Sequence, residues 1–343
     1  MFPHRTSLLL CSLTCLVVAP IPTLAKEGVL RAGIVGCDTS HVTAFTKLIN
    51  DPAATGPFAD VEITVAYPGG SADIPDSKNR VEGFVKQLRE QGVKIVDSLE
   101  ELANESDVIL IESVDGRPHL EQFRAIAKGK PVFVDKPAAG SLADLLAIYR
   151  IADETHTPVY SSSSLRFTKE LQAAAADKSI GDMIGCETSS PMSTEKHHPD
   201  LFWYGIHGVE PLFTVMGTGC ESVSRTDSPL STLVVGKWKD GRLGSYRGEK
   251  KGYYYTFTIF GTKSAVQGQT KGGYDLAVTE MCKFFKSGKP PVTHEETIEI
   301  YAFMEAADES KREGGKPVTI ADVIQRAEAK SREKSSAAAA GGN

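Results

Sequence analysis

The sequence contains little cysteine and almost no tryptophan. Six cysteines and two tryptophans occur among 343 residues. Cys11 and Cys15 stand close to the N-terminus, and the other four cysteines are widely spaced without a C-x-x-C pair. This spacing excludes a disulfide scaffold and a zinc ribbon. It leaves open a single bridge if the chain folds in an oxidising compartment.

Clusters of positive charge are also missing. The chain has 38 lysines and arginines against 44 aspartates and glutamates, which gives a formal net charge of −6. No expected helix carries a basic stripe, so the sequence gives no sign of a nucleic-acid partner.

Long apolar runs are absent except near the N-terminus. Leu8 to Val18 is apolar, follows His4 and Arg5, and precedes a small-residue cleavage site ending at Ala25. The run is too short for a comfortable membrane span, and no arginine pair stands before it. We expect residues 1–25 to be a signal peptide, which implies export to the periplasm or the medium and no stable membrane anchor.

Strand and helix patterns alternate from residue 28 to residue 162. Val61 to Tyr67 alternates strictly, as a half-buried strand does, whereas Val108 to Val114 is nearly all apolar, as in a strand covered on both faces. Ser141 is placed to cap a helix that reaches Thr155. Repeated units of this kind predict an α/β domain with a doubly wound parallel sheet of the Rossmann type. Further strands are expected at 29–35, 93–96, 131–134 and 158–161, and helices from 41, at 77–91 and at 118–128.

The pattern changes after Ser164. A helix is expected at 166–178, and strands then dominate before two final helices. This predicts an α+β domain with a largely antiparallel open sheet over residues 163–324. Residues 325–343 are low in complexity and are expected to be disordered. The expected strands lie at 183–189, 232–238, 243–247, 253–260 and 265–268, and the helices at 274–287 and 295–312.

Two side chains stand out as chemical groups. Lys136 follows the strand at 131–134, and open parallel sheets bind their ligands at that edge. His207 lies in the second half, within YGIHGVE. An ammonium and an imidazole that face one cleft suit proton transfer coupled to redox or elimination at a polyol carbon. Without such a cleft, Lys136 is a solvated lysine and His207 a buried structural histidine.

The loop after the first strand departs from a dinucleotide fingerprint. In Gly36-Cys37-Asp38-Thr39-Ser40-His41, Asp38 stands in place of the second glycine and His41 in place of the third. A carboxylate about 4 Å from a phosphate charge costs roughly 4 kcal/mol at an effective dielectric of about 20. Asp38 therefore either weakens phosphate binding or turns away and leaves backbone N–H groups for the phosphate.

Seven motifs occur in an order and spacing that resemble the Gfo/Idh/MocA oxidoreductases. The resemblance extends over nearly all of the chain after residue 25. It implies an amino-terminal Rossmann domain that binds NAD or NADP, and a carboxyl-terminal sheet domain that lines the substrate pocket and often mediates oligomers. The motifs are GIVG at 33–36, His119, GKPVFVDKP at 129–137, SLRF at 164–167, GIHGVE at 205–210, FGTKSAV at 260–266 and SGKPPVTHEE at 287–296.

The same resemblance implies roles for individual residues. Lys136 would touch the substrate near the nicotinamide, and His207 would be the acid–base group. Trp203 stands where the family often has an aspartate, so His207 acts alone or with a partner from the His197-His198 loop. Arg166, His198, Lys136 and His207 are the expected substrate contacts. The expected cofactor contacts are Gly33, Gly36, Cys37, Asp38, Thr39, Ser40, Ser113, His119 and Asp135, of which Asp135 could instead pair with a nearby cation or cap a turn.

These features predict an exported, homo-oligomeric NAD- or NADP-dependent oxidoreductase that acts on a sugar, cyclitol or related polyol. A non-redox lyase or isomerase on the same fold is one alternative, and a carbohydrate-binding protein without catalysis is another. In the former, a divalent metal would be held by Asp38, His41, His119 and the His197-His198 loop. Their spacing matches no strong metal motif, so no metal ligand is assigned.

Overall fold

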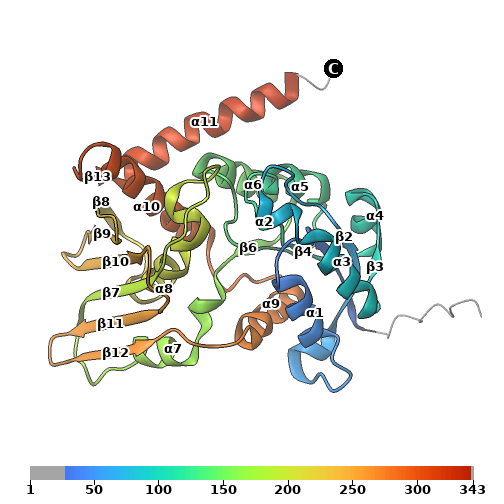
Figure 1. Cartoon of the computed structure of the whole chain (residues 1–343), viewed down its shortest axis with the longest axis horizontal. Helices are drawn as coiled ribbons and strands as arrows, with labels where there is room; N and C mark the ends of the chain where they lie inside the picture. The colour runs from blue at the N-terminus through green and yellow to red at the C-terminus, as the bar shows by residue number, and fades with distance from the viewer. Residues whose placement is uncertain (1–27, 341–343) are drawn as a thin grey trace, which may run out of the picture.

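The protein consists of two sheets with helices between and around them (Figure 1). The computed structural model describes the backbone of residues 28–340 and the side chains of residues 28–333. The expected signal peptide, residues 1–25, lies outside the described residues. Within that described range, no helix is long and apolar enough to cross a membrane.

The first sheet is the parallel sheet that the βα repeats predicted. Its six strands lie in the order β3-β2-β1-β4-β5-β6, and every neighbouring pair is parallel. The direction of winding reverses between β1 and β4, which opens a crevice at the carboxyl ends of the strands. The strands are β1 (Leu30–Val35), β2 (Val61–Tyr67), β3 (Lys94–Ile95), β4 (Val108–Ile111), β5 (Val132–Val134) and β6 (Val159–Ser161).

Helices cover both faces of this sheet. The predicted cap of α6 is confirmed, because the Ser141 hydroxyl accepts a hydrogen bond from the backbone N–H of Asp144. The helix expected at 77–91 is two helices, and α4, which Ser98 caps, was not predicted. The elements are α1 (His41–Ile49), a 3-10 turn (Gly56–Asp60), α2 (Pro75–Lys78), α3 (Val81–Glu90), α4 (Leu99–Glu105), α5 (His119–Ile126) and α6 (Leu142–Thr155).

The second sheet confirms the predicted antiparallel character of the second half. Seven strands lie in the order β12-β11-β7-β10-β9-β8-β13. Among the described strands of this sheet, only the β7–β10 pair is parallel. Two of these strands, β8 and β13, were not predicted. The strands are β7 (Met183–Pro191), β8 (Cys220–Asp227), β9 (Ser231–Trp238), β10 (Leu243–Glu249), β11 (Thr256–Gly261), β12 (Ala265–Gln269) and β13 (Val318–Thr319).

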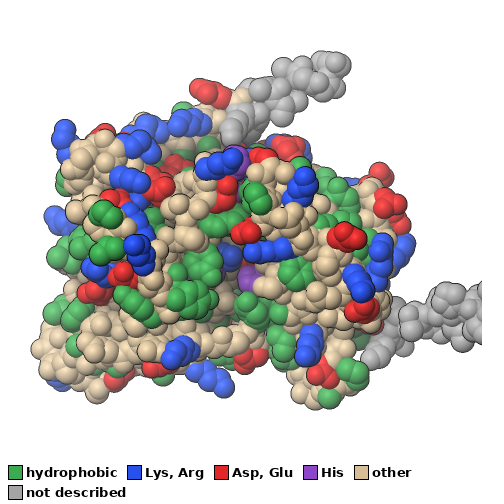
Figure 2. Space-filling view, in the orientation of Figure 1, with side chains coloured by type: hydrophobic (Ala, Val, Ile, Leu, Met, Phe, Trp, Pro, Cys, Tyr) green, Lys and Arg blue, Asp and Glu red, His purple; other side chains and the backbone are tan. Residues whose placement is uncertain are grey.

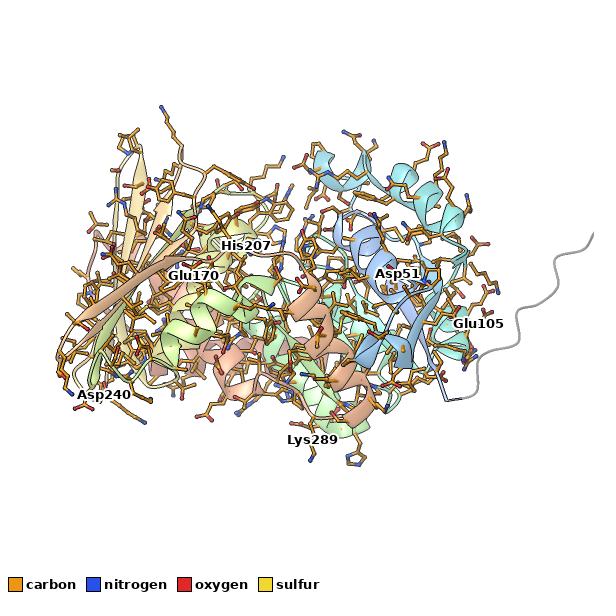
Figure 3. All side chains as sticks on the ribbon, turned by 90° about the horizontal axis from the view of Figure 1, so that it is seen from below. Asp51, Glu105, Glu170, His207, Asp240 and Lys289 are labelled. Atoms are coloured by element: carbon orange, nitrogen blue, oxygen red, sulfur yellow. The ribbon has the colours of Figure 1, made fainter. Side chains whose placement is uncertain are left out.

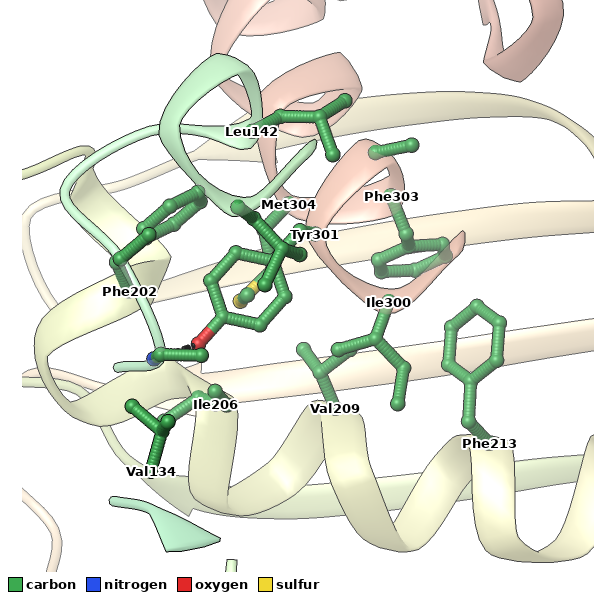
Figure 4. Packing of buried hydrophobic residues seen from close by; sticks show 14 of the residues in the cluster. Val134, Leu142, Phe202, Ile206, Val209, Phe213, Ile300, Tyr301, Phe303 and Met304 are labelled. Atoms are coloured by element: carbon green, nitrogen blue, oxygen red, sulfur yellow. Dashed lines mark hydrogen bonds between the residues drawn. The ribbon is translucent and has the colours of Figure 1, made fainter. Parts of the chain in front are cut away.

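Helices pack against one face of the second sheet and leave other apolar side chains exposed. Figure 4 shows Val209 and Phe213 of α8 (Ile206–Met216) facing Ile300 and Phe303 of α10 (His294–Arg312). Ile184, Leu233, Leu243 and Phe260 of the sheet strands remain exposed. The remaining elements are a 3-10 turn (Ser164–Phe167), α7 (Lys169–Ala175), a π-helical turn (Leu201–Gly205) and α9 (Asp275–Ser287).

For residues 325–340, the part of the expected disordered tail that the structure describes, the expectation is wrong. The chain forms α11 (Ile320–Ala340), which packs against α6. Val323, Ala327 and Ser331, four residues apart, are buried on one face of this helix. The low-complexity composition is rich in alanine, lysine, glutamate and arginine, which are also the best helix formers.

Helix α10 of the second half holds the loop that follows β5. The Tyr301 hydroxyl accepts a hydrogen bond from the backbone N–H of Ala138, drawn as a dashed line in Figure 4. Glu305 accepts one from the N–H of Leu142 at 2.7 Å. Two points of the loop are thereby fixed from the other half of the molecule, so the lysine at its start has a defined position.

Candidate functional site

A pocket of about 540 Å³ lies between the two halves of the molecule. Figure 2 shows this region as a hollow with a histidine side chain visible inside it. Thr39 and Ser40 line the pocket where α1 begins, Lys136 lines it from the carboxyl edge of the first sheet, and His207 lines it from the second half. The two groups singled out in the sequence therefore share one cavity.

Lys136 reaches this pocket as a buried cation without a partner. It stands two residues after the end of β5, and only 8% of its surface is exposed. No described residue makes a hydrogen bond or a close ion pair with its ammonium, although its positive charge acts on Glu112, Asp135 and His207. A protein ammonium carries three donors, so these donors are available to oxygen atoms in the pocket.

His207 lies in the first turn of α8, on the side of the second sheet that faces the Rossmann-type half (Figure 3). Its Nδ1 is 2.9 Å from the hydroxyl of Ser163. Burial, and after it the positive charge of Lys136, lower the pKa of His207 well below its usual value. The imidazole is therefore neutral near pH 7, as a proton acceptor must be.

The carboxylate of Asp38 is turned away from the pocket. It accepts hydrogen bonds from the Ser77 hydroxyl at 2.6 Å and from the Val114 N–H at 2.9 Å. Burial raises the pKa of this carboxyl, and the hydrogen bonds from Ser77 and Val114 act in the opposite direction. Of the two sequence alternatives for Asp38, the structure favours the one in which it does not oppose a phosphate.

The start of α1 is open to the pocket at Thr39 and Ser40. The N-cap residue Ser40 makes no capping hydrogen bond, and the His41 N–H donates only a long one, 3.4 Å, to the Thr39 hydroxyl. The N–H groups and dipole of a helix start attract anions. Gly36 precedes it at φ +90°, where a Cβ atom would come within 2.6 Å of the Ser113 nitrogen. These residues fit the pyrophosphate of a dinucleotide, although the loop lacks the second and third glycines of the usual fingerprint.

Four of the expected cofactor contacts lie in the protein interior and do not line the pocket. A Cβ at Gly33 would meet the Ser106 hydroxyl, and Cys37 is fully buried. The Ser113 hydroxyl pairs with Gln122. The ring of His119 is held between the backbone carbonyls of Ser113 and Ala138. We therefore correct the roles of Gly33, Cys37, Ser113 and His119 to packing and loop support.

Arg166, expected to bind substrate, is also outside the pocket lining. Its Nε is 2.7 Å from Glu210 and its Nη1 is 2.7 Å from Glu296. The guanidinium is buried, so two carboxylates rather than a substrate oxygen use its charge. Through these two ion pairs, Arg166 connects the Ser164–Phe167 turn to α8 and to α10.

His198 is held by a buried polar network instead of facing a substrate. Its Nε2 lies 3.1 Å from Asp115 and its Nδ1 3.2 Å from Glu195. His197 also pairs with Glu195. The loop therefore supplies no partner for His207. The metal set considered for a non-redox enzyme is not assembled either, since Asp38, His119 and the two histidines each have other partners.

The Asp115 carboxylate gives a testable pH dependence of stability. It lies beside His198 and accepts hydrogen bonds from Arg117 and Ser71. Burial alone would raise the pKa of Asp115, but these partners outweigh it and hold the pKa well below its usual range. The pKa of an aspartate in the unfolded chain is about 3.9. Because the pKa in the folded state is lower, the ionised carboxylate stabilises the fold at pH values above about 3.9, and this stabilisation is lost as the pH falls below that value.

We therefore expect Asp115→Asn to lower the free energy of unfolding at pH 7, with a difference from wild type that shrinks as the pH is lowered from about 4 to 2. Urea unfolding at several pH values measures this difference. Asp153→Asn, at an exposed carboxylate of α6, is the control and should leave the pH profile unchanged. A difference that stays constant down to pH 2 would contradict the assignment.

Several pocket residues were not predicted from the sequence. Five of them are aromatic: Trp203, Tyr204, Tyr253, Tyr255 and Tyr274. Asp76 and Arg80 line the end near α1, where a cation could meet a phosphate or a ribose. The run of three tyrosines at 253–255 was the available signal, but it was assigned wholly to a strand, whereas β11 begins only at Thr256.

The strand order, the crevice at the carboxyl edge and the helix start that opens to the pocket define a Rossmann-type fold of the nucleotide-binding class. Residues 30–163 match the model of the Gfo/Idh/MocA family, described as an oxidoreductase family with an NAD-binding Rossmann fold. This match covers the Rossmann-type half of the chain and agrees with the resemblance that the motifs gave. A comparison with curated proteins finds no match.

Solved structures share the fold over most of the chain. A probable dehydrogenase from Thermotoga maritima is 21% identical, with a TM-score of 0.70, covering 86% of this chain and 100% of that one. The myo-inositol dehydrogenase from Lactobacillus casei, in complex with NAD(H) and myo-inositol, is 14% identical, with a TM-score of 0.68 and coverage of 85% and 96%. The scyllo-inositol dehydrogenase of that organism, with NAD(H) and scyllo-inositol, is 14% identical, with a TM-score of 0.69 and coverage of 85% and 99%.

Proposed function

We propose that the protein oxidises a hydroxyl group of a sugar, cyclitol or related polyol with NAD or NADP. The observation that carries the proposal is the shared pocket of Lys136 and His207, in which an unpaired ammonium and a neutral imidazole come from different halves of the chain. A proton acceptor beside a fixed positive charge is the pair of groups that alcohol oxidation requires.

The lining of the pocket supports a polyhydroxylated substrate. Tyr204, Tyr253 and Tyr255 offer both ring faces and hydroxyl groups, and Ser164 and Thr270 add further hydroxyls. Polar groups at several points of an aromatic pocket fix the orientation of a ligand that has many hydroxyls. The inositol ligands named for two of the structural relatives belong to the same chemical class.

We assign the chemistry as follows. Lys136 donates a hydrogen bond to the reacting hydroxyl and stabilises the negative charge that develops on its oxygen. His207 accepts the hydroxyl proton, and Ser163 holds the ring through Nδ1. Thr39 and Ser40 would hold the pyrophosphate at the start of α1. When bound, the nicotinamide supplies the hydride acceptor.

Titration of the purified protein with NAD(H) and with NADP(H) tests the proposal. We expect a dissociation constant below about 1 mM for one of the two, which corresponds to at least about 4 kcal/mol of binding free energy. The same titration decides between NAD and NADP. Folded protein, shown by circular dichroism, that binds neither at this level would end the dehydrogenase assignment.

Removal of the proton acceptor should affect turnover more than binding. We expect His207→Asn to lower kcat for polyol oxidation by about 10²-fold, since a positioned general base contributes about 10² to 10⁴. Steady-state kinetics on the polyol that gives the highest activity in the wild type measures this loss. His156→Asn is the matched control, because His156 is an exposed residue at φ 53°, a conformation that asparagine tolerates. Equal activity in both variants would exclude His207 as the base.

We also propose that the protein is exported and forms a homo-oligomer. The leader-like residues 1–25 support export, and amino-terminal sequencing of the secreted protein would find the cleavage after Ala25. The exposed apolar side chains Ile184, Leu233, Leu243 and Phe260 support assembly of copies through the second sheet. Light scattering of the purified protein gives the mass, and a monomer would exclude this assembly.

A further inference from the structure

Three potential metal ligands meet at the carboxyl edge of the first sheet, and one of them, His41, also lines the pocket. His41 is the first residue of α1, Glu112 directly follows β4, and Asp135 directly follows β5. The parallel sheet brings these positions together because β1, β4 and β5 are neighbours and their carboxyl ends share one edge. One ligand atom from each residue lies within 4.8 Å of the others.

The Glu112 carboxylate is buried without any partner. It is 0% exposed, and neither of its oxygen atoms has a hydrogen-bond partner. The nearest basic nitrogen, Nδ1 of His41, is 3.8 Å away, which is too far for a hydrogen bond. That nitrogen is already 2.7 Å from Asp135. Buried carboxylates are normally paired or coordinate a metal. Burial and the neighbouring Asp135 charge raise the pKa of Glu112, and only the charge of Lys136 acts in the other direction.

The other two side chains are already oriented for coordination. The His41 ring stacks on Phe45 with the centroids 5.0 Å apart and meets the edge of Tyr274 at 4.9 Å, which fixes its plane. Its Nδ1 faces both carboxylates, at 2.7 Å and 3.8 Å. Ligand bonds of about 2.0–2.2 Å place neighbouring ligand atoms about 3 to 4 Å apart, so small side-chain adjustments would close this group around one ion.

We propose that His41, Glu112 and Asp135 bind a divalent cation of the zinc or manganese type. One imidazole and two carboxylates form a mixed nitrogen–oxygen ligand set, which suits these ions better than magnesium or calcium. The two negative charges of the carboxylates match the charge of the ion. Three protein ligands leave coordination positions for water or substrate oxygen. The inference goes beyond the proposed oxidation and does not depend on dinucleotide binding.

The site differs from the metal set considered from the sequence. His41 belongs to both sets, but Glu112 and Asp135 replace Asp38, His119 and the His197-His198 loop. Asp135 also joins the site directly to Lys136, its neighbour in the chain. An ion held by Asp135 would therefore fix the end of β5 from which the lysine extends.

Metal analysis and calorimetric titration of the full purified protein test the proposal. After treatment with EDTA and its removal, ZnCl₂, MnCl₂ and MgCl₂ are titrated separately. We expect one equivalent of Zn²⁺ or Mn²⁺ per chain with a dissociation constant below about 10 µM, and weaker binding of Mg²⁺. Glu112→Gln should weaken binding of the preferred ion at least about 100-fold, whereas Glu187→Gln, at an exposed carboxylate, should leave it unchanged.

Two outcomes would overturn the proposal. One is that neither Zn²⁺ nor Mn²⁺ binds to folded wild-type protein at a metal concentration of about 100 µM, which is about ten times the expected upper limit of the dissociation constant. A thermal midpoint of Glu112→Gln at or above that of the wild type would then show that Glu112 is a buried neutral acid. The other is binding that persists in Glu112→Gln and in His41→Asn, which would place the ion elsewhere.

The test separates this inference from the proposed oxidation. Titration of the metal-free protein with NAD(H) and NADP(H) reports on the dinucleotide alone. A protein that binds a dinucleotide but neither Zn²⁺ nor Mn²⁺ would lose only the metal-site proposal. A protein that binds the metal but no dinucleotide would lose only the dehydrogenase assignment.

Discussion

Replacing Lys136 by methionine is expected to lower kcat for polyol oxidation by about 10³-fold or more, with a folded protein. Methionine preserves the length of the buried stem but removes the charge that would stabilise the developing oxyanion. The same change should raise the pKa of His207 towards its usual value, because the positive charge of Lys136 is one cause of its depression. Steady-state kinetics measures the first effect, and histidine NMR titration measures the second.

The NMR readout distinguishes a catalytic lysine from a structural one. A lysine that only supported the loop would change activity without shifting the titration of His207. Lys130→Met is a suitable comparison, since Lys130 lies before β5 and bonds the carbonyls of Ala103 and Ser106, away from the pocket. Full activity in Lys136→Met would remove the lysine from the reaction.

Arg166→Met is expected to destabilise the fold by about 3–5 kcal/mol, the usual cost of removing one partner of a buried ion pair. The substitution leaves the Glu210 carboxylate buried without its guanidinium, and only 1% of that side chain is exposed. Because burial already raises the pKa of Glu210, the variant carboxyl can take up a proton, and the loss of stability should therefore be larger at high pH. Urea unfolding at two pH values measures both effects.

Two further variants separate this structural role from the substrate contact expected from the sequence. Adding Glu210→Gln should recover part of the stability, since a neutral amide costs less to bury than a carboxylate. Arg124→Met removes a surface pair with Glu121 and should cost no more than about 1 kcal/mol. A stable Arg166→Met protein with a greatly raised KM would instead return Arg166 to the substrate site.

Regular elements were predictable from the sequence where one local signal dominated. Strict alternation placed β2 at its correct ends, and the Ser141 cap placed the start of α6. Helix α4 was missed because it spans only Leu99–Glu105. Strand β4 is shorter than the apolar run that predicted it, since it ends at Ile111. The alanine-rich end was misassigned because composition alone does not show that a helix can bury a stripe against α6.

The site was predictable to the extent that topology determines it. The carboxyl edge of a parallel sheet placed Lys136 in a crevice, and the family motif placed His207 opposite. The spacing of residues in the sequence does not show in which direction a side chain points. Only the three-dimensional structure therefore showed that Asp38 turns away from the pocket, that Arg166 pairs with glutamates and that His198 pairs with Asp115. The meeting of Glu112 with His41 and Asp135 depends on both the strand order and three rotamers.

Helix α9 ties the two parts of the chain together. Although it follows the second sheet in sequence, its residues Val278 and Phe284 belong to the apolar cluster of the Rossmann-type half, where Phe284 meets Tyr160 with ring centroids 4.8 Å apart. A fragment ending near residue 162 would therefore keep its entire parallel sheet. It would still expose to solvent the apolar side chains that α9 covers in the full chain. To produce the Rossmann-type half as a separate protein, α9 would have to be joined to the segment that carries β1 to β6.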